Sequence, residues 1–159
     1  MSRIEPLKRN VRFLGGVMSE GDVWFTATGE EDGKPLIFRS RQKVPSGVVE
    51  SDYPTRLSIF WPYLGESQNG MPDEETNYGQ IELEDALVLL DVPGVSFLML
   101  VVTGNGRKEW HWYVSDVGKW MARLNELLAD HAAFPIEIEN SPEPDWALYR
   151  NFISGVAGI

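Results

Sequence analysis

The sequence VSFLMLVVTGNGRKEWHWYV, residues 95–114, gives the clearest indication of how this chain folds. Its first eight residues are apolar except for Ser96, which predicts a strand covered on both faces. Residues 103–106, Thr-Gly-Asn-Gly, then supply the Asn-Gly pair that favours a tight turn with positive φ angles. We therefore expect the residues after the turn to pair back on the first strand as a hairpin.

Three further strands are expected before this hairpin. Residues 23–28 and 35–40 are rich in β-branched and aromatic side chains, and Asp32-Gly33 between them is a turn signal. This pattern predicts an N-terminal hairpin. After a loop, residues 55–61 place Leu57, Ile59 and Trp61 on one face, which predicts a third strand.

Two helices are expected around the central hairpin. Residues 77–90 carry apolar side chains at spacings of three and four, so we expect a helix with one buried stripe. Residues 65–76 before it are polar and predict a mobile loop. A second helix is expected over residues 117–128, capped by Ser115 or Asp116.

The chain then ends on one more strand and one short helix. Residues 135–139 alternate Ile and Glu, which predicts a strand with a solvated face. Residues 145–153 follow two prolines and predict a closing helix capped by Asp145.

From the third strand onward the expected order is β-α-β-β-α-β, which predicts an α+β fold of the ferredoxin-like kind with two helices on one sheet face. We expect the N-terminal hairpin to extend this sheet beside residues 95–102 and the opposite sheet face to stay partly open. Residues 22–159 are expected to form one domain. Residues 1–21 are expected to be an extension that is either a strand or disordered.

Composition limits the chemistry and the location. The sequence has no cysteine, which excludes disulfides, thiol nucleophiles and cysteine-ligated metals and fits a reducing cytoplasm. We find no secretory signal pattern near the N-terminus, and the longest apolar run is too short to cross a bilayer. A cytoplasmic protein without a membrane partner is predicted.

The charge of the chain predicts the sign of its partner. The net charge is −10, and residues 44–91 carry ten acidic side chains against a single base, Arg56. Such a surface repels phosphate backbones and favours a basic protein partner, although the acids would equally keep the domain in solution. Arg39, Arg41 and Lys43 form a small basic patch, but the net charge counts against nucleic acid.

No catalytic, metal or cofactor site is predicted. The two histidines, His111 and His131, lie on different expected elements, so they form no local metal motif. We expect His111 to pack rather than to catalyse. The rival interpretation is a metal-dependent hydrolase that uses His111 with carboxylates from Glu82, Asp85, Glu137 or Glu139.

Six tryptophans are many for a core of this size. We expect most of them to pack in the core, and the alternative is an exposed aromatic patch on one sheet face that would anchor a protein partner. Together with the acidic segment, this patch gives a set of predicted partner-binding residues. They are Trp61, Asp73, Glu74, Glu75, His111 and Tyr113.

Four segments together resemble a bacterial family called domain of unknown function 695. They are residues 33–36 (GKPL), 83–87 (LEDAL), 103–107 (TGNGR) and 143–149 (EPDWALY). The resemblance extends over residues 22–149. Its most specific part is the acidic-Pro-acidic-Trp-x-x-Tyr ending, in which Glu143 stands in for the more usual Asp.

The resemblance implies a fold and a structural motif rather than an activity. The family is similar to the regulators of ribonuclease E activity, type B, which inhibit an endoribonuclease by binding it. No catalytic residues come with it. In the ending, Pro144 is expected to fix the path of the chain, Asp145 to cap the last helix, and Trp146 and Tyr149 to bury against the sheet. Glu143 precedes them.

These observations predict a non-enzymatic protein-binding or regulatory module with an acidic face. A specific form is an inhibitor of a nucleic-acid-acting enzyme, either a ribonuclease regulator or a toxin immunity protein. The alternatives are the metal-dependent hydrolase above and a domain that binds a small ligand between sheet and helices. The sequence leaves the oligomeric state open.

Overall fold

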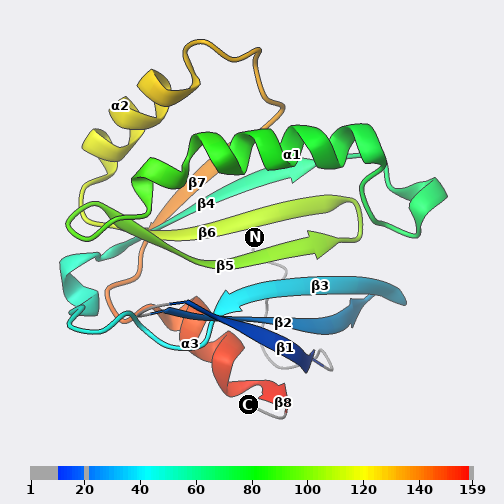
Figure 1. The fold of residues 1–159 in the computed structure, drawn as a ribbon, viewed down its shortest axis with the longest axis horizontal. Helices are drawn as coiled ribbons and strands as arrows, with labels where there is room; N and C mark the ends of the chain where they lie inside the picture. The colour runs from blue at the N-terminus through cyan, green and yellow to red at the C-terminus, as the bar shows by residue number, and fades with distance from the viewer. Residues whose placement is uncertain (1–10, 20–21, 158–159) are drawn as a thin grey trace.

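The structure is a computed structural model that describes residues 11–19 and 22–157. It is a mixed α+β molecule, as the sequence predicts, with its helices packed on one sheet (Figure 1). Within the described residues no helix is both long and apolar enough to cross a membrane.

The strands lie side by side in a single sheet. In chain order they are β1 Val11–Ser19, β2 Asp22–Glu31, β3 Lys34–Arg41, β4 Thr55–Pro62, β5 Ser96–Gly104, β6 Arg107–Val114, β7 Glu137–Pro142 and β8 Val156–Ala157. Across the sheet their order is β7-β4-β6-β5-β3-β2-β1-β8. Paired neighbours are antiparallel except β1 and β8, which are parallel.

Three α-helices and three short 3-10 turns connect the strands in the described part of the chain. The helices are α1 Glu74–Ala86, α2 Val117–Leu128 and α3 Ala147–Ser154, and the turns are η1 Glu50–Asp52, η2 Glu66–Gln68 and η3 Val88–Leu90.

The hairpin of β5 and β6 forms the centre of the sheet. Its turn places Asn105 at φ 50° and Gly106 at φ 80°, the positive angles that an Asn-Gly turn favours. On its other side β5 pairs with β3, with Phe38 opposite Val102. The predicted position of the N-terminal hairpin beside this strand is therefore confirmed.

Each face of the sheet carries its own layer of helices. Leu83 of α1 and Trp120 of α2 pack with residues of β4 and β6, such as Ile59, in one core. On the other face, Phe152 of α3 packs with Phe38 of β3 and other residues of β2, β3 and β5. The expectation of a partly open second face is therefore wrong for these strands, because the last helix of the chain covers them.

Helix α1 starts earlier than the sequence pattern predicts. The carboxylate of Asp73 accepts a hydrogen bond of 2.8 Å from the backbone N–H of Thr76, and this cap begins the helix within the segment expected to be a mobile loop. The α-helix then ends at Ala86, before the turn η3. Tyr78 and Ile81 are exposed, so a second apolar stripe faces outward.

The last long strand, β7, is also shifted from its expected bounds. Strand β7 runs three residues beyond the predicted end at residue 139, because Asn140 and Ser141 pair with Leu57 and Arg56 of β4. Pro135 lies before the strand, where its missing N–H removes no ladder hydrogen bond.

The N-terminal extension contains a strand. Val11–Ser19 is β1, which pairs with β2 and so joins the same sheet as the rest of the chain. The same prediction, a strand or disorder, also covers residues 1–10 and 20–21, and these lie outside the described residues.

Candidate functional site: an acidic groove with aromatic walls

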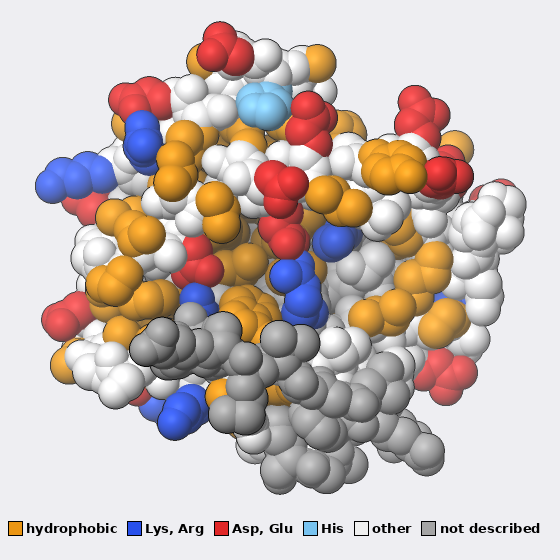
Figure 2. Space-filling view, in the orientation of Figure 1, with side chains coloured by type: hydrophobic (Ala, Val, Ile, Leu, Met, Phe, Trp, Pro, Cys, Tyr) orange, Lys and Arg blue, Asp and Glu red, His pale blue; other side chains and the backbone are white. Residues whose placement is uncertain are grey.

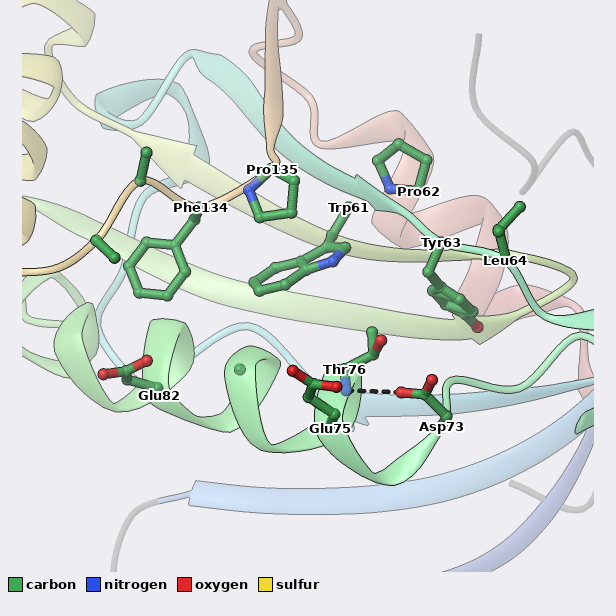
Figure 3. A pocket seen from close by; sticks show the side chains of 13 residues that line it. Trp61, Pro62, Tyr63, Leu64, Asp73, Glu75, Thr76, Glu82, Phe134 and Pro135 are labelled. Carbon is green, nitrogen blue, oxygen red and sulfur yellow. Dashed lines mark hydrogen bonds between the residues drawn. The ribbon is translucent and has the colours of Figure 1, made fainter.

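A groove with a volume of about 690 Å³ runs along one side of α1. Its opposite wall is the end of β4 and the segment between α2 and β7. Figure 3 shows three aromatic rings on that wall, facing three carboxylates on the helix side. The rings belong to Trp61, Tyr63 and Phe134, and the carboxylates to Asp73, Glu75 and Glu82.

The aromatic wall is held in place by packing. Trp61 is only 7 % exposed, and its ring centre lies 5.8 Å from that of Phe134. Gly79 of α1 allows this close packing, because a Cβ there would lie 3.1 Å from Cη2 of Trp61. Tyr63 donates a hydrogen bond of 2.7 Å from its hydroxyl to the carbonyl of Gly70. The rings therefore form a firm surface.

The carboxylates differ in how they are engaged. Asp73 caps α1, and the hydrogen bond from the backbone N–H of Thr76 holds the pKa of Asp73 below its ordinary value of 3.8. Glu82 lies 3.4 Å from Nδ1 of His131, a long and weak contact. Glu75 is exposed and belongs to the same side of the helix.

None of the described residues that line this groove is a lysine or an arginine. Aromatic faces attract cations, and carboxylates pair with ammonium and guanidinium groups. Acidic side chains also occur along the band over α1 on the face shown in Figure 2. The groove is thus chemically suited to a positively charged ligand.

The structure brings together three of the predicted partner-binding residues, namely Trp61, Asp73 and Glu75. Glu74 lies on the other side of α1, where it lines a second pocket, and accepts a hydrogen bond of 3.2 Å from the Tyr78 hydroxyl.

Sequence reasoning missed two residues of the aromatic wall, Tyr63 and Phe134. Both lie in loops beside a proline, Tyr63 after Pro62 and Phe134 before Pro135. This neighbouring proline was the only feature of the sequence that set them apart. Residues 63 and 134 are far apart in the chain, so the fold alone places them on one wall.

His111 lies in a buried polar row on the second sheet face. It is 0 % exposed, with Nδ1 at 2.7 Å from the hydroxyl of Ser58 and Nε2 at 2.9 Å from the carboxylate of Glu109. Arg107 donates to the same carboxylate at 3.1 Å. These residue types are those of a catalytic triad, but Ser58 is only 2 % exposed and cannot reach a substrate in this conformation.

Tyr113 is also buried, and it connects the sheet to the ending of the chain. Its ring stacks on Trp146 with centres 4.4 Å apart, and its hydroxyl donates to the carboxylate of Glu143. Burial first, and then the charge of Glu143, raise the pKa of Tyr113. The same carboxylate accepts from Arg56 at 2.9 Å.

The acidic-Pro-acidic-Trp-x-x-Tyr ending performs a structural task. Contrary to the prediction from the sequence, Asp145 does not cap α3. The backbone N–H of Leu148 instead donates to Glu143 at 3.2 Å, because Trp146, with φ 54°, reverses the chain and brings Glu143 over the helix start. Pro144 is exposed between them. The hydroxyl of Tyr149 donates to the Arg41 carbonyl at 2.7 Å.

In the described structure most of the tryptophans pack in the core, as expected, and the alternative of an exposed patch is not found. Trp24 is partly buried, and the other five indoles are at most 7 % exposed. The helices α1 and α2 cover the face on which the strand tryptophans lie, so these rings fill the core. Trp61 alone combines core packing with a place in the groove.

The rival metal site finds no geometric support in the described residues. No group of three or more potential ligands among them could hold a metal ion. His111 bonds to Ser58 and Glu109 rather than to any of the four carboxylates, Glu82, Asp85, Glu137 or Glu139, that the hydrolase interpretation offers as its partners.

Comparison with known proteins identifies a family. The model of the family of unknown function DUF695 matches residues 22–154. A search of the curated proteins finds no match.

Proposed function

The chain belongs to the family of unknown function DUF695, and we propose that it is a non-enzymatic module that binds a basic segment of a protein partner in the acidic groove. The single observation that carries the proposal is the composition of that groove. Three rings and three carboxylates line it, and none of its described lining residues is a lysine or an arginine.

Electrostatics support a protein partner over nucleic acid. With a net charge of −10, the chain repels a phosphate backbone at long range and attracts a basic surface. We therefore propose, more specifically, that the partner is a nucleic-acid-acting enzyme in the cytoplasm. The module would then act as a ribonuclease regulator or a toxin immunity protein, because such enzymes use basic surfaces to hold phosphates.

A rigid scaffold supports recognition by a preformed groove. We assign the segment from β4 to β7 to the ferredoxin-like arrangement, and the sheet order β7-β4-β6-β5 with antiparallel neighbours supports this assignment. Both walls of the groove belong to this unit, since α1, β4 and the segment before β7 contribute to it.

The test is the binding of a fluorescein-labelled octalysine peptide, followed by fluorescence anisotropy at low and high salt. We expect binding that weakens steeply with salt, because exposed charges are screened. The double variant Glu75→Gln/Glu82→Gln should bind about tenfold more weakly, which corresponds to two charge pairs of roughly 0.7 kcal/mol each.

The matched control is a double variant that removes two carboxylates outside the groove, Asp85→Asn/Glu126→Gln. Both residues are exposed and neither lines the groove. Loss of binding in this control equal to the loss in the groove variant, or binding indifferent to salt, would refute the proposal. Thermal melting of every variant verifies that the fold is retained.

A further inference from the structure

The spacing of the carboxylates in the groove sets a distance that a ligand must match. Glu75 and Glu82 lie seven residues apart on α1, which is nearly two turns, and both face the groove (Figure 3). At 1.5 Å per residue, their α-carbons are separated by about 10 Å along the helix axis. Asp73 is already engaged as the helix cap, so these two side chains are the ones that can turn to a ligand.

Between the two glutamates the groove is open to the ring of Trp61. Gly79 stands midway and has no side chain, and the indole lies directly beneath it. Trp61 is 7 % exposed, yet its indole N–H donates to no other described residue. Figure 3 shows the ring within the groove, with its nitrogen edge turned toward the end where Tyr63 lies. This nitrogen is not among the side-chain atoms that are sealed from solvent without a partner, so it is free to donate to a carbonyl oxygen of a ligand in the groove.

We propose that the groove reads an extended, polyproline II-like segment in which two basic side chains are three residues apart. A chain in this conformation repeats every three residues and rises 3.1 Å per residue, so such side chains share a face at about 9 Å. One cation would pair with Glu75 and the other with Glu82. The backbone between them would cross Gly79 and present a carbonyl to the indole N–H of Trp61. Aromatic grooves are a recurrent binding surface for this conformation.

This inference rests on the proposed function and adds a register to it, namely the spacing of three residues between the two basic side chains of the ligand. A β-strand segment would place side chains on one face at i and i+2, about 7 Å apart, which is too short for the two glutamates. Adjacent basic residues point in different directions. The spacing of three is therefore the one that satisfies both carboxylates at once.

The experiment compares four proline-rich peptides of equal length. Three of them contain two lysines at spacings of two, three and five residues, and the fourth contains one lysine. We expect the spacing of three to give the tightest binding, by about threefold over the other spacings, since one more exposed pair contributes about 0.7 kcal/mol. Glu75→Gln and Glu82→Gln should each reduce this peptide to the affinity of the one-lysine peptide. Asp85→Asn should leave the preference unchanged.

A spectroscopic readout follows the indole directly. In ¹H–¹⁵N spectra, the Nε1 resonance of Trp61, assigned through Trp61→Phe, should move on binding of the peptide with a spacing of three. The resonance of the buried Trp146 should not move, because its Nε1 already donates to the carbonyl of Tyr53 at 2.9 Å.

The outcomes separate the register from the proposed function. If all spacings bind with equal affinity and binding still depends on Glu75 and Glu82, the register is overturned. The proposal that the groove binds a basic segment then stands. Binding that ignores both glutamates overturns both proposals. Binding of N-acetyl-lysine amide as tight as that of the peptide with a spacing of three would show a small-cation site and would also overturn the register.

Discussion

Single residues on the second sheet face form a polar row that holds two strands together. Ser58 of β4 stands opposite His111 of β6 in the strand register, and the two side chains are hydrogen bonded. Glu109 continues the row on the other side of the imidazole. Buried polar groups are stabilising only while each keeps its partner, so the row makes the pairing of β4 with β6 specific.

Removal of one side chain from this polar row should therefore lower the stability of the fold by more than the small change in side-chain volume suggests. Ser58→Ala leaves Nδ1 of His111 without its partner in a buried site, and we expect the free energy of unfolding to fall by about 1–3 kcal/mol. Urea denaturation measures this loss. The same substitution at the exposed Ser67 is the control and should change stability by less than about 0.5 kcal/mol. Equal effects at both positions would contradict the role of the row.

At the scale of the elements, α1 is attached to the sheet by a carboxylate as well as by its apolar stripe. Glu84 accepts from Arg39 of β3 at 2.5 Å and from the indole of Trp110 at 2.8 Å. Burial by itself would raise the pKa of Glu84, but the charge of Arg39 and the two hydrogen bonds outweigh it, and the pKa lies below its ordinary value of 4.5. The attachment thus depends on an ionised side chain.

This lowered pKa predicts a dependence of stability on pH. A carboxyl group with a lower pKa in the folded state stabilises the fold above its unfolded pKa and loses that contribution as pH falls through the folded value. We expect the free energy of unfolding to decline as pH falls below about 4.5, and Glu84→Gln to show a shallower decline. Urea titrations at several pH values measure the slopes. Parallel slopes for the two proteins would contradict the assignment, and Glu126→Gln, an exposed site, is the control.

At the scale of the whole molecule, one sheet joins two differently built halves. The β7-β4-β6-β5 half carries α1 and α2, and the β3-β2-β1-β8 half lies beside it, linked through the pairing of β3 with β5. Helix α3 covers the second face across that junction, because its core contains residues of β2, β3 and β5. Strand β5 is consequently enclosed by neighbours on both edges and by helices on both faces.

Amide hydrogen exchange should follow this enclosure. We expect the slowest exchange in β5 and β6, whose residues are buried along most of their length, and faster exchange in the edge strand β7, which is mostly exposed. Mass spectrometry of peptic fragments measures the order. The finding that β7 is protected as strongly as β5 would show that some further contact covers this edge.

Sequence patterns predicted the local structure of this protein well where the pattern itself was local. The hairpin at Asn105-Gly106 follows from turn chemistry, and α2 follows from its 3.6-residue periodicity and from Asp116, which accepts from the N–H of Lys119. The start of α1 was missed, because polar residues around the cap gave no apolar periodicity. The cap of α3 was assigned to Asp145 because only the folded chain shows that Glu143 reaches Leu148.

The α+β class, the hairpins and the acidic character followed from the sequence, since these depend on neighbouring residues or on composition. The sequence also singled out Trp61, Asp73 and Glu75, which lie in one groove of the folded chain. Only the tertiary structure showed which side chains line the groove. It buried His111 and Tyr113, closed the second sheet face with α3 and brought Phe134 opposite the carboxylates of α1. The physical reason is that a groove consists of side chains from elements distant in sequence, and only the packing of helices on a sheet fixes which of them meet.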